Sequence, residues 1–295
     1  MPTTTSSSAS TARPSRSAVP DAAPFQPASG PAAGVPLPAP PTGDVLGVRF
    51  HATRYTEATD HVMRWAARAE SRAVFCSNTH STIEARDEAG FRDVLNRADL
   101  NTPDGVPIVW AMRHQGLDAE RVYGPDLTLY VLRAAAAEGV PVGFYGSSPE
   151  TLAALLAELP ALAPGLEVAC ALSPPFRPLT EAEDEAYTAE IVASGARVLF
   201  VGLGCPRQER WVDAHRDRIP AVMLAVGAAF DFHAGRVPQA PPVLQRAGLE
   251  WAFRLVQEPR RLWRRYARVV PGFVWGYARQ ALRTRRRGVG APRSA

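Results

Sequence analysis

Residues 197–209 have the sequence RVLFVGLGCPRQE, in which an apolar run is followed by two glycines, a proline and polar residues. Residues 197–202 are rich in β-branched and aromatic side chains, which favours a buried strand. Pro206 suits the first turn of a helix, so we predict a helix over residues 206–218. A buried strand that leads directly into a helix is typical of a parallel sheet in an α/β fold.

The same alternation of apolar strands and amphipathic helices extends in both directions from this segment. Strands are predicted at residues 45–50, 72–77, 140–145, 166–171, 197–202 and 221–226. Helices are predicted at residues 55–70, 105–115, 126–138, 149–159, 180–194 and 206–218. The pattern predicts an α/β fold, a Rossmann-like parallel sheet with helices on both faces, followed by a C-terminal helical appendage.

The two ends of the chain do not share this alternation. Residues 1–43 hold ten Pro and seven Ser without a hydrophobic period, which predicts a disordered tail. Residues 44–245 contain the α/β core. Residues 246–295 are predicted to form amphipathic helices, with Pro259 and Pro271 beginning successive ones.

The C-terminal segment, residues 246–295, concentrates the positive charge of the chain. It holds 13 Arg against two acidic residues, a net charge of +11, and because the whole chain carries +4 the rest carries −7. Four of its arginines are spaced to share one helical face: Arg254, Arg261, Arg265 and Arg268. Aromatic residues are interleaved with the arginines. This composition suits a phosphate-rich partner, whether an anionic bilayer face, a nucleotide diphosphate or nucleic acid.

Several absences narrow the function. No apolar run approaches the roughly 18 residues of a membrane-spanning helix, and the N-terminus lacks the apolar segment of a secretory signal. The three cysteines are odd in number and lack metal-ligand spacing, which favours reduced thiols in the cytoplasm. The chain has no Asp-x-Asp sequence and no zinc-type spacing of His, so we expect neither a metal nor a cofactor. These patterns predict a cytoplasmic protein, soluble or peripheral to a membrane.

Ligands of open α/β sheets bind beyond the carboxyl ends of the strands, so the residues after each strand are candidates for a site. After the strand at residues 197–202, Gly204 allows close approach of the backbone, and the helix N-terminus offers N–H groups to a phosphate. Gln208 suits a hydrogen bond to a uracil or a ribose. An ordinary strand–helix turn is the alternative interpretation, since the segment lacks the third glycine of a dinucleotide fingerprint.

Other loops carry further candidates. Asn78 follows the second predicted strand. Asp104, which follows no predicted strand and precedes Gly105, is either a plain turn residue or, if it lies at the carboxyl edge of the sheet, a general base beside apolar walls. Asp231, after the last predicted strand, suits either a sugar hydroxyl or a helix cap. Ser148 is interpreted as a helix cap rather than a ligand contact.

Taken together, these segments resemble the WecG/TagA/CpsF family of bacterial glycosyltransferases. The resemblance covers about residues 73–266. It rests on Asn78 and on six motifs in order: ADLNTPDG (98–105), RVYGPDL (121–127), VGLGCPRQE (201–209), VGAAFDF (226–232), GLEW (248–251) and RLVQEPRRLWRRY (254–266). Each motif alone is weak, but six in order over nearly 200 residues are specific.

The resemblance implies an inverting, metal-independent transfer of a hexose from a UDP-sugar to a polyprenyl-diphosphate-linked sugar in cell-surface polysaccharide assembly. The hexose is expected to be of the N-acetylmannosamine or N-acetylmannosaminuronate type. The resemblance also implies docking on the inner face of the cell membrane through the C-terminal appendage, whose arginines complete the nucleotide site. A homo-oligomer is a further expectation, from the self-association of family members.

The resemblance assigns candidate residues by position. Asp104 matches the family's proposed general base, Asn78 a polar pocket residue, and Gln208 a nucleotide-side residue. Cys76 stands where some members carry Thr, and because a thiol is a poorer hydrogen-bond partner than a hydroxyl, the sugar preference is open. The remaining substrate-binding candidates are Gly204, Asp231, Arg254, Arg261 and Arg264.

Two other functions are compatible with parts of the sequence. A nucleotide-cofactor-dependent oxidoreductase would use the same kind of sheet, but the glycine fingerprint is incomplete and no acidic residue follows about 20 residues later. A nucleic-acid-binding module would use the basic C-terminal segment. Because that segment resembles the family's appendage, we expect membrane docking and no nucleic-acid partner.

Overall fold

The computed structural model describes residues 37–289, with side chains for all of these except Pro242, Arg246 and residues 285–289. The predicted disordered tail therefore lies outside the described residues as far as position 36. The first strand begins at Thr42, one residue before the predicted end of that tail.

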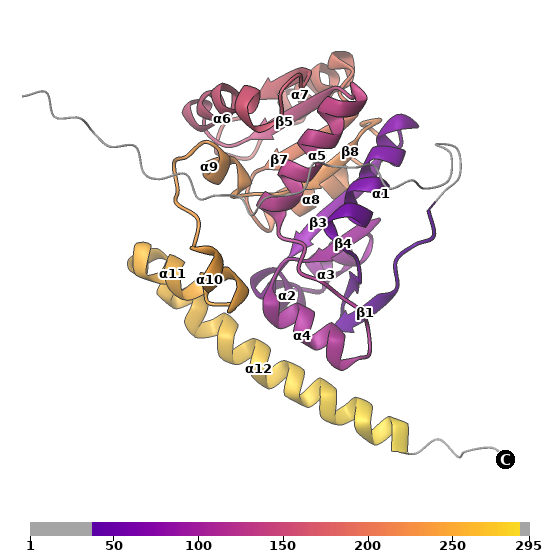
Figure 1. Ribbon diagram of the computed structural model, residues 1–295, viewed down its shortest axis with the longest axis vertical. Helices are drawn as coiled ribbons and strands as arrows, with labels where there is room; N and C mark the ends of the chain where they lie inside the picture. The colour runs from indigo at the N-terminus through magenta and orange to yellow at the C-terminus, as the bar shows by residue number, and fades with distance from the viewer. Residues whose placement is uncertain (1–36, 290–295) are drawn as a thin grey trace, which may run out of the picture.

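A parallel sheet forms the core, as the sequence predicts (Figure 1). It has six strands, of which five were predicted and β4 was not. The strand order is β4-β3-β8-β7-β5-β6. The bounds are β3 (Arg72–Ser77), β4 (Leu100–Pro103), β5 (Val142–Gly146), β6 (Val168–Leu172), β7 (Val198–Gly202) and β8 (Val222–Ala225). The first two strands, β3 and β4, lie at one end of the sheet, and β5 and β6 lie at the other. The last two, β7 and β8, lie between them. The crevice of such a sheet lies beyond the carboxyl ends of its central strands.

The strand predicted at residues 45–50 is wrong. The chain instead forms an antiparallel hairpin of β1 (Thr42–Val45) and β2 (Val48–His51), separate from the main sheet. Leu46 and Gly47 both have positive φ, at 56° and 87°, so the chain reverses between them. Two consecutive residues with positive φ are typical of tight hairpin turns.

Helices cover both faces of the sheet. The first six are α1 (Tyr55–Ala67), α2 (Thr79–Asp87), α3 (Ala89–Asn96), α4 (Val106–His114), α5 (Gly124–Glu138) and α6 (Pro149–Leu162). They are followed by α7 (Glu181–Ser194), α8 (Arg207–Ala214) and α9 (Ala229–His233). The six predicted helices are present, and α2, α3 and α9 were not predicted.

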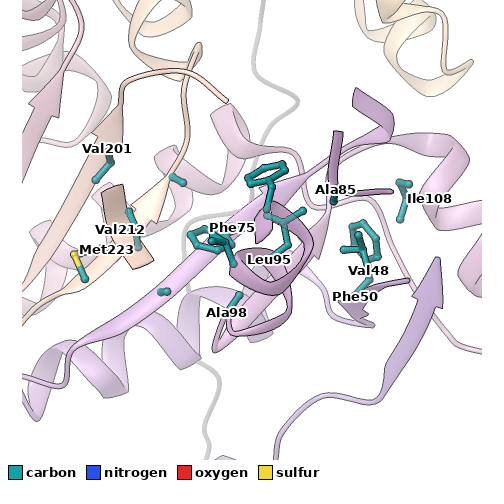
Figure 2. Packing of buried hydrophobic residues seen from close by; sticks show 14 of the residues in the cluster. Val48, Phe50, Phe75, Ala85, Leu95, Ala98, Ile108, Val201, Val212 and Met223 are labelled. Atoms are coloured by element: carbon teal, nitrogen blue, oxygen red, sulfur yellow. The ribbon is translucent and has the colours of Figure 1, made fainter. Parts of the chain in front are cut away.

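The sheet separates two hydrophobic clusters. On β3, Phe75 belongs to one cluster and Val74 to the other, because successive side chains of a strand point to opposite faces. Figure 2 shows the first cluster, in which Phe75 and Met223 of the sheet gather with Leu95 of α3 and Val212 of α8. The second cluster holds side chains of α1, α5 and α6. Burial on both faces explains the continuous apolar runs of the central strands.

The C-terminal helices are α10 (Pro242–Arg246), α11 (Glu250–Gln257) and α12 (Pro259–Val289), and Figure 1 shows α12 running along one end of the core. The prediction that Pro271 begins a new helix is wrong, since Pro271 lies inside α12. Val269 and Phe273, on either side of Pro271, are both buried, and their packing holds the two halves in one helix.

Helix α12 approaches the core closely at two glycines. A Cβ atom at Gly276 would lie 3.1 Å from Leu46 Cδ2, and one at Gly272 would lie 3.4 Å from Arg86 Nη1. Arg254 lies on α11, so the prediction that it shares a helical face with arginines of α12 is wrong. No helix of the described residues is both long and apolar enough to span a bilayer.

Candidate active site

A cavity of about 1290 Å³ lies at the carboxyl ends of the central strands, between the sheet and the C-terminal helices. Eight of the sequence-predicted site residues line it: Cys76, Asn78, Asp104, Gly204, Gln208, Asp231, Arg254 and Arg261. The alternation of strands and helices thus brought positions from 76 to 261 to one edge of the sheet, as expected for parallel strands.

Asp104 directly follows β4 and is held from both sides. Its N–H donates to the main-chain oxygen of Ser77 (3.0 Å), and its Oδ2 accepts a hydrogen bond from the N–H of Gly124 at the start of α5 (3.3 Å). Burial raises the pKa of Asp104 to about 7, the nearby charge of Arg121 acts in the opposite direction, and that of Glu250 raises it further. A carboxyl group with a pKa near neutrality is suited to general-base chemistry.

Cys76 and Asn78 lie where β3 ends. Burial, followed by the charge of Asp104, raises the pKa of the Cys76 thiol to about 12, so the thiol stays protonated. Asn78 caps α2, because its Oδ1 accepts hydrogen bonds from the N–H groups of His80 (3.0 Å) and Ser81 (3.3 Å). Asn78 therefore both lines the cavity and fixes the direction in which α2 leaves the sheet.

Gln208 holds the turn after β7 together. Its Oε1 accepts from the N–H of Gly204 (3.0 Å), and its Nε2 donates to Glu209 Oε1 (2.9 Å). Pro206 follows a cis peptide bond and precedes α8, which begins one residue later than predicted. Glu209 is a second buried carboxyl group in the cavity wall, and burial raises its pKa to about 7.

Basic side chains also line the cavity. Arg207, Arg254, Arg261 and Arg265 line it together with Asp231. Burial raises the pKa of Asp231, whereas a hydrogen bond from Thr151 and the charges of neighbouring arginines lower it. The guanidinium of Arg254 lies 5.8 Å from the ring centroid of Phe232, and Arg261 Nη2 donates to Glu258 Oε1 (2.9 Å). Clustered guanidinium groups suit the charge of a phosphate ligand.

Arg264 is the one predicted site residue that does not line the cavity. Its side chain is exposed, and its guanidinium lies 5.5 Å from the ring centroid of Trp263. Arg265, one position further along α12, lines the cavity instead. Among the described residues, no group of three or more His, Cys, Asp or Glu side chains could hold a metal ion.

A comparison with known protein families shows which family the chain belongs to. Residues 43–287 match the model of the glycosyl transferase WecG/TagA/CpsF family. The chain belongs to this family. It is therefore a glycosyltransferase, an enzyme that transfers a sugar from a donor to an acceptor.

The glycosyltransferase has three further residues beside Asp104 that sequence reasoning did not select. Arg121 Nε donates to the main-chain oxygen of Asp104 (2.6 Å), and Arg121 Nη2 donates to Glu250 Oε2 (2.6 Å). Tyr123 Oη donates to Glu250 Oε1 (2.9 Å). All three residues lie within motifs that carry the family resemblance, but nothing in their spacing indicates that positions 121 and 250 meet.

Proposed function

We propose that the chain is an inverting, metal-independent glycosyltransferase that moves a hexose from a UDP-sugar to a polyprenyl-diphosphate-linked sugar. The observation that carries the proposal is that Asp104 and several arginines, among them Arg254 and Arg261, line one cavity. A base on one side and cations on the other are what a single displacement at an anomeric carbon needs. Family membership favours this reaction over the oxidoreductase alternative.

The proposed reaction is a single step. Asp104 takes the proton of the acceptor hydroxyl while the acceptor oxygen bonds to the anomeric carbon and the bond from that carbon to the UDP oxygen breaks. The negative charge that develops on the departing diphosphate is stabilised by Arg254 and Arg261. Attack on the side opposite the leaving group inverts the anomeric configuration, so the single step needs no covalent sugar–enzyme intermediate.

The remaining wall residues form the proposed substrate pocket. Cys76 and Asn78 lie on the side of Asp104 and are proposed to contact the sugar, for which we propose an N-acetylmannosamine type. Gly204 and Gln208 are proposed to contact the nucleotide through the turn that they stabilise. Asp231, among arginines, is proposed to accept hydrogen bonds from hydroxyl groups of the donor.

The outer face of α12 is proposed to dock on the inner face of the cell membrane. Trp263, Trp275 and Leu282 are 54%, 72% and 58% exposed. Exposed arginines of the same helix, Arg264, Arg279 and Arg283, accompany them. Apolar and aromatic side chains beside arginines are typical of helices that lie on an anionic bilayer. This arrangement favours lipid over nucleic acid as the partner of the basic segment, and a homo-oligomer stays a prediction of the resemblance.

The test is an activity screen of the purified full-length protein. A panel of UDP-sugars is incubated with a synthetic polyprenyl-diphosphate-linked acceptor, with and without a metal chelator. We expect one UDP-sugar to give an acceptor product heavier by one sugar, unaffected by the chelator and with inverted anomeric configuration by NMR. Retained configuration, or turnover only with added metal, would contradict the mechanism. No product with any UDP-sugar would contradict the donor class.

A further inference from the structure

Glu250 joins the C-terminal helices to the residues around Asp104. It is the first residue of α11, and its carboxylate accepts hydrogen bonds from Arg121 Nη2 (2.6 Å) and Tyr123 Oη (2.9 Å). The Arg121 and Glu250 side chains are only 20% and 16% exposed. The guanidinium of Arg121 also lies 4.2 Å from the ring centroid of Tyr123, so the three groups form one compact cluster.

The other ion pairs between the C-terminal helices and the core are of a different kind. Arg268 of α12 pairs with Glu84 (3.2 Å) and Asp87 (2.8 Å) of α2, and its side chain is 53% exposed. Exposed pairs of this kind contribute little to stability. A largely buried pair is sensitive to the loss of either partner, because the remaining charge is left without compensation.

The cluster continues from Glu250 to Asp104 through the chain that precedes α5. Arg121 Nε donates to the main-chain oxygen of Asp104 (2.6 Å), and the Gly124 N–H donates to the Asp104 carboxylate (3.3 Å). The N–H of Tyr123, between them, donates to Tyr55 Oη (3.1 Å). Residues 121–124 are therefore fixed between the carboxylate of α11 and the proposed base.

We propose that Glu250 is a positioning residue that holds Arg121 against the main chain of Asp104 and away from its carboxylate, so that the base is complete only when α11 is seated. The inference rests on the proposed function, because it assigns Asp104 the role of the base. Physically, the carboxylates of Glu250 and Asp104 compete for the guanidinium of Arg121. With Glu250 in place, Nη2 of Arg121 is occupied; without that charge, Nη2 is free to pair with Asp104.

The groups that face Asp104 fix the sign of the expected effect. They are Cys76 from β3, Arg121 and Tyr123 from the segment before α5, the Gly124 N–H of α5, and Glu250 and Arg254 from α11. Burial raises the pKa of Asp104 most; Arg121, Gly124 and Arg254 lower it, and Glu250 raises it. Removing the charge of Glu250 therefore lowers the pKa of Asp104 directly, and a freed Arg121 lowers it further.

The test compares Glu250→Gln with Asp87→Asn in the full-length chain. Asp87→Asn also breaks an ion pair to the C-terminal helices, but at α2 rather than beside Asp104. The readout is kcat/KM against pH for whichever UDP-sugar the screen identifies. The wild-type rate is expected to fall as pH drops below about 7, because the base must be unprotonated.

In Glu250→Gln the acid limb should move to lower pH by roughly one unit, and the plateau should fall several-fold because the base is weaker. Asp87→Asn should keep the wild-type limb. An unmoved limb in Glu250→Gln, or a limb moved to higher pH, would overturn the proposal. Glu250→Asp, which keeps the charge, should lower the plateau with little movement of the limb; a limb moved as far as in the Gln variant would also overturn it.

A second readout does not depend on turnover. The titration of the Asp104 carboxyl is followed by carbon-13 NMR of aspartate-labelled protein, with the resonance assigned by its loss in Asp104→Asn. We expect a midpoint near 7 in wild type and a lower midpoint in Glu250→Gln. Equal midpoints would refute the role of Glu250 even if no UDP-sugar were a substrate, whereas a lower midpoint without any turnover would leave the inference standing and reject the donor class alone.

Discussion

The α/β core contributes more of the acidic residues that line the cavity and the C-terminal helices more of the arginines, although Arg207 of the core and Glu250 of α11 line it as well. The core supplies the buried carboxyl groups of Asp104 and Glu209, whereas α11 and α12 supply Arg254, Arg261 and Arg265. The sequence shows the same division, since residues 246–295 carry +11 and the rest of the chain −7. Burial raises the pKa of a carboxyl group toward the range of a general base, and the doubly covered sheet provides that burial.

The two regions are also held together differently. Nearly every side chain of the central strands is buried, whereas among the described side chains of α12 only Leu262, Val269 and Phe273 are buried. Burying each such side chain stabilises the packed state by about 1.5–3 kcal/mol. These three buried side chains therefore hold α12 against the core with far less buried apolar surface than the strands have. The proposed base lies in the core, and three of the arginines that line the cavity, Arg254, Arg261 and Arg265, lie on the helices packed against it.

Asp104→Asn is expected to have the largest effect, and it tests whether the core supplies the general base. We expect kcat to fall by about 10²–10⁴-fold, because the amide has the shape of the carboxyl group but cannot take the acceptor proton. The measurement is the transfer rate with a saturating UDP-sugar. Asp118→Asn is the matched control, since Asp118 is an exposed carboxylate whose side chain is 80% accessible. Full activity in Asp104→Asn would show that Asp104 is not the general base.

Arg254→Ala tests the contribution of the C-terminal helices. Removing one charged hydrogen-bond donor from a diphosphate should lower kcat/KM by about 10- to 100-fold, and UDP should bind more weakly by a similar factor. Calorimetric titration with UDP measures the second effect. Arg260→Ala is the control, because Arg260 is exposed on α12 and does not line the cavity. A comparable loss in Arg264→Ala would support the sequence-based prediction against the geometry.

How far the sequence predicts the core is clear from the strand that it missed. β4 (Leu100–Pro103) contains Asn101, Thr102 and a proline, so it has no apolar pattern. In the fold, the Asn101 N–H donates to His51 Nδ1 (2.9 Å) and its side chain donates to the main-chain oxygen of Arg49 (2.9 Å). The β1–β2 hairpin thus supplies hydrogen-bond acceptors to the buried donors of Asn101 in this polar strand, while Asn101 Oδ1 has no hydrogen-bond partner among the described residues. Only tertiary partners reveal such a strand, whereas apolar strands are visible from their composition.

The site divides in the same way. Asp104 could be selected because it stands in a turn-like Asp-Gly pair within the ADLNTPDG motif. Only the fold shows that it follows β4, a strand that was not predicted, at the carboxyl edge of the sheet. Arg265 could not be preferred to Arg264, because that choice depends on how α12 is rotated on its glycine contacts with the core. Glu250 could not be placed beside Arg121 either, since the two positions lie 129 residues apart.

Trp275→Glu tests whether the protein contacts the membrane through the outer face of α12. We expect association with vesicles that contain anionic phospholipid to weaken by about tenfold, since a large apolar side chain is replaced by a charge of the wrong sign. Flotation of the protein with the vesicles measures the effect. Val192→Glu, on α7 of the core, is the control, because Val192 is also exposed, at 42%. Equal losses in both variants would show that the membrane is not contacted through α12.

Cys76→Ser should have the smallest effect. Its shift, set beside that of Glu250→Gln, compares how the core and the C-terminal helices change the basicity of Asp104. A Cβ atom at Gly124 would lie 3.7 Å from both Cys76 Sγ and Asp104 Oδ2, so the thiol and the carboxylate border the same space. A hydroxyl donates a stronger hydrogen bond than a thiol and favours the ionised carboxylate. The acid limb of kcat/KM should therefore move to lower pH by a few tenths of a unit.

Cys170→Ser makes the same exchange on β6, away from the cavity, and should leave the limb unmoved. The shift in Cys76→Ser is expected to be smaller than that in Glu250→Gln, because a neutral donor replaces another neutral donor while Glu250→Gln removes a full charge and frees an arginine. A shift as large as that of Glu250→Gln would mean that the core alone sets the basicity of Asp104. A shift to higher pH would mean that the hydroxyl turns away from the carboxylate, toward its neighbour Thr102.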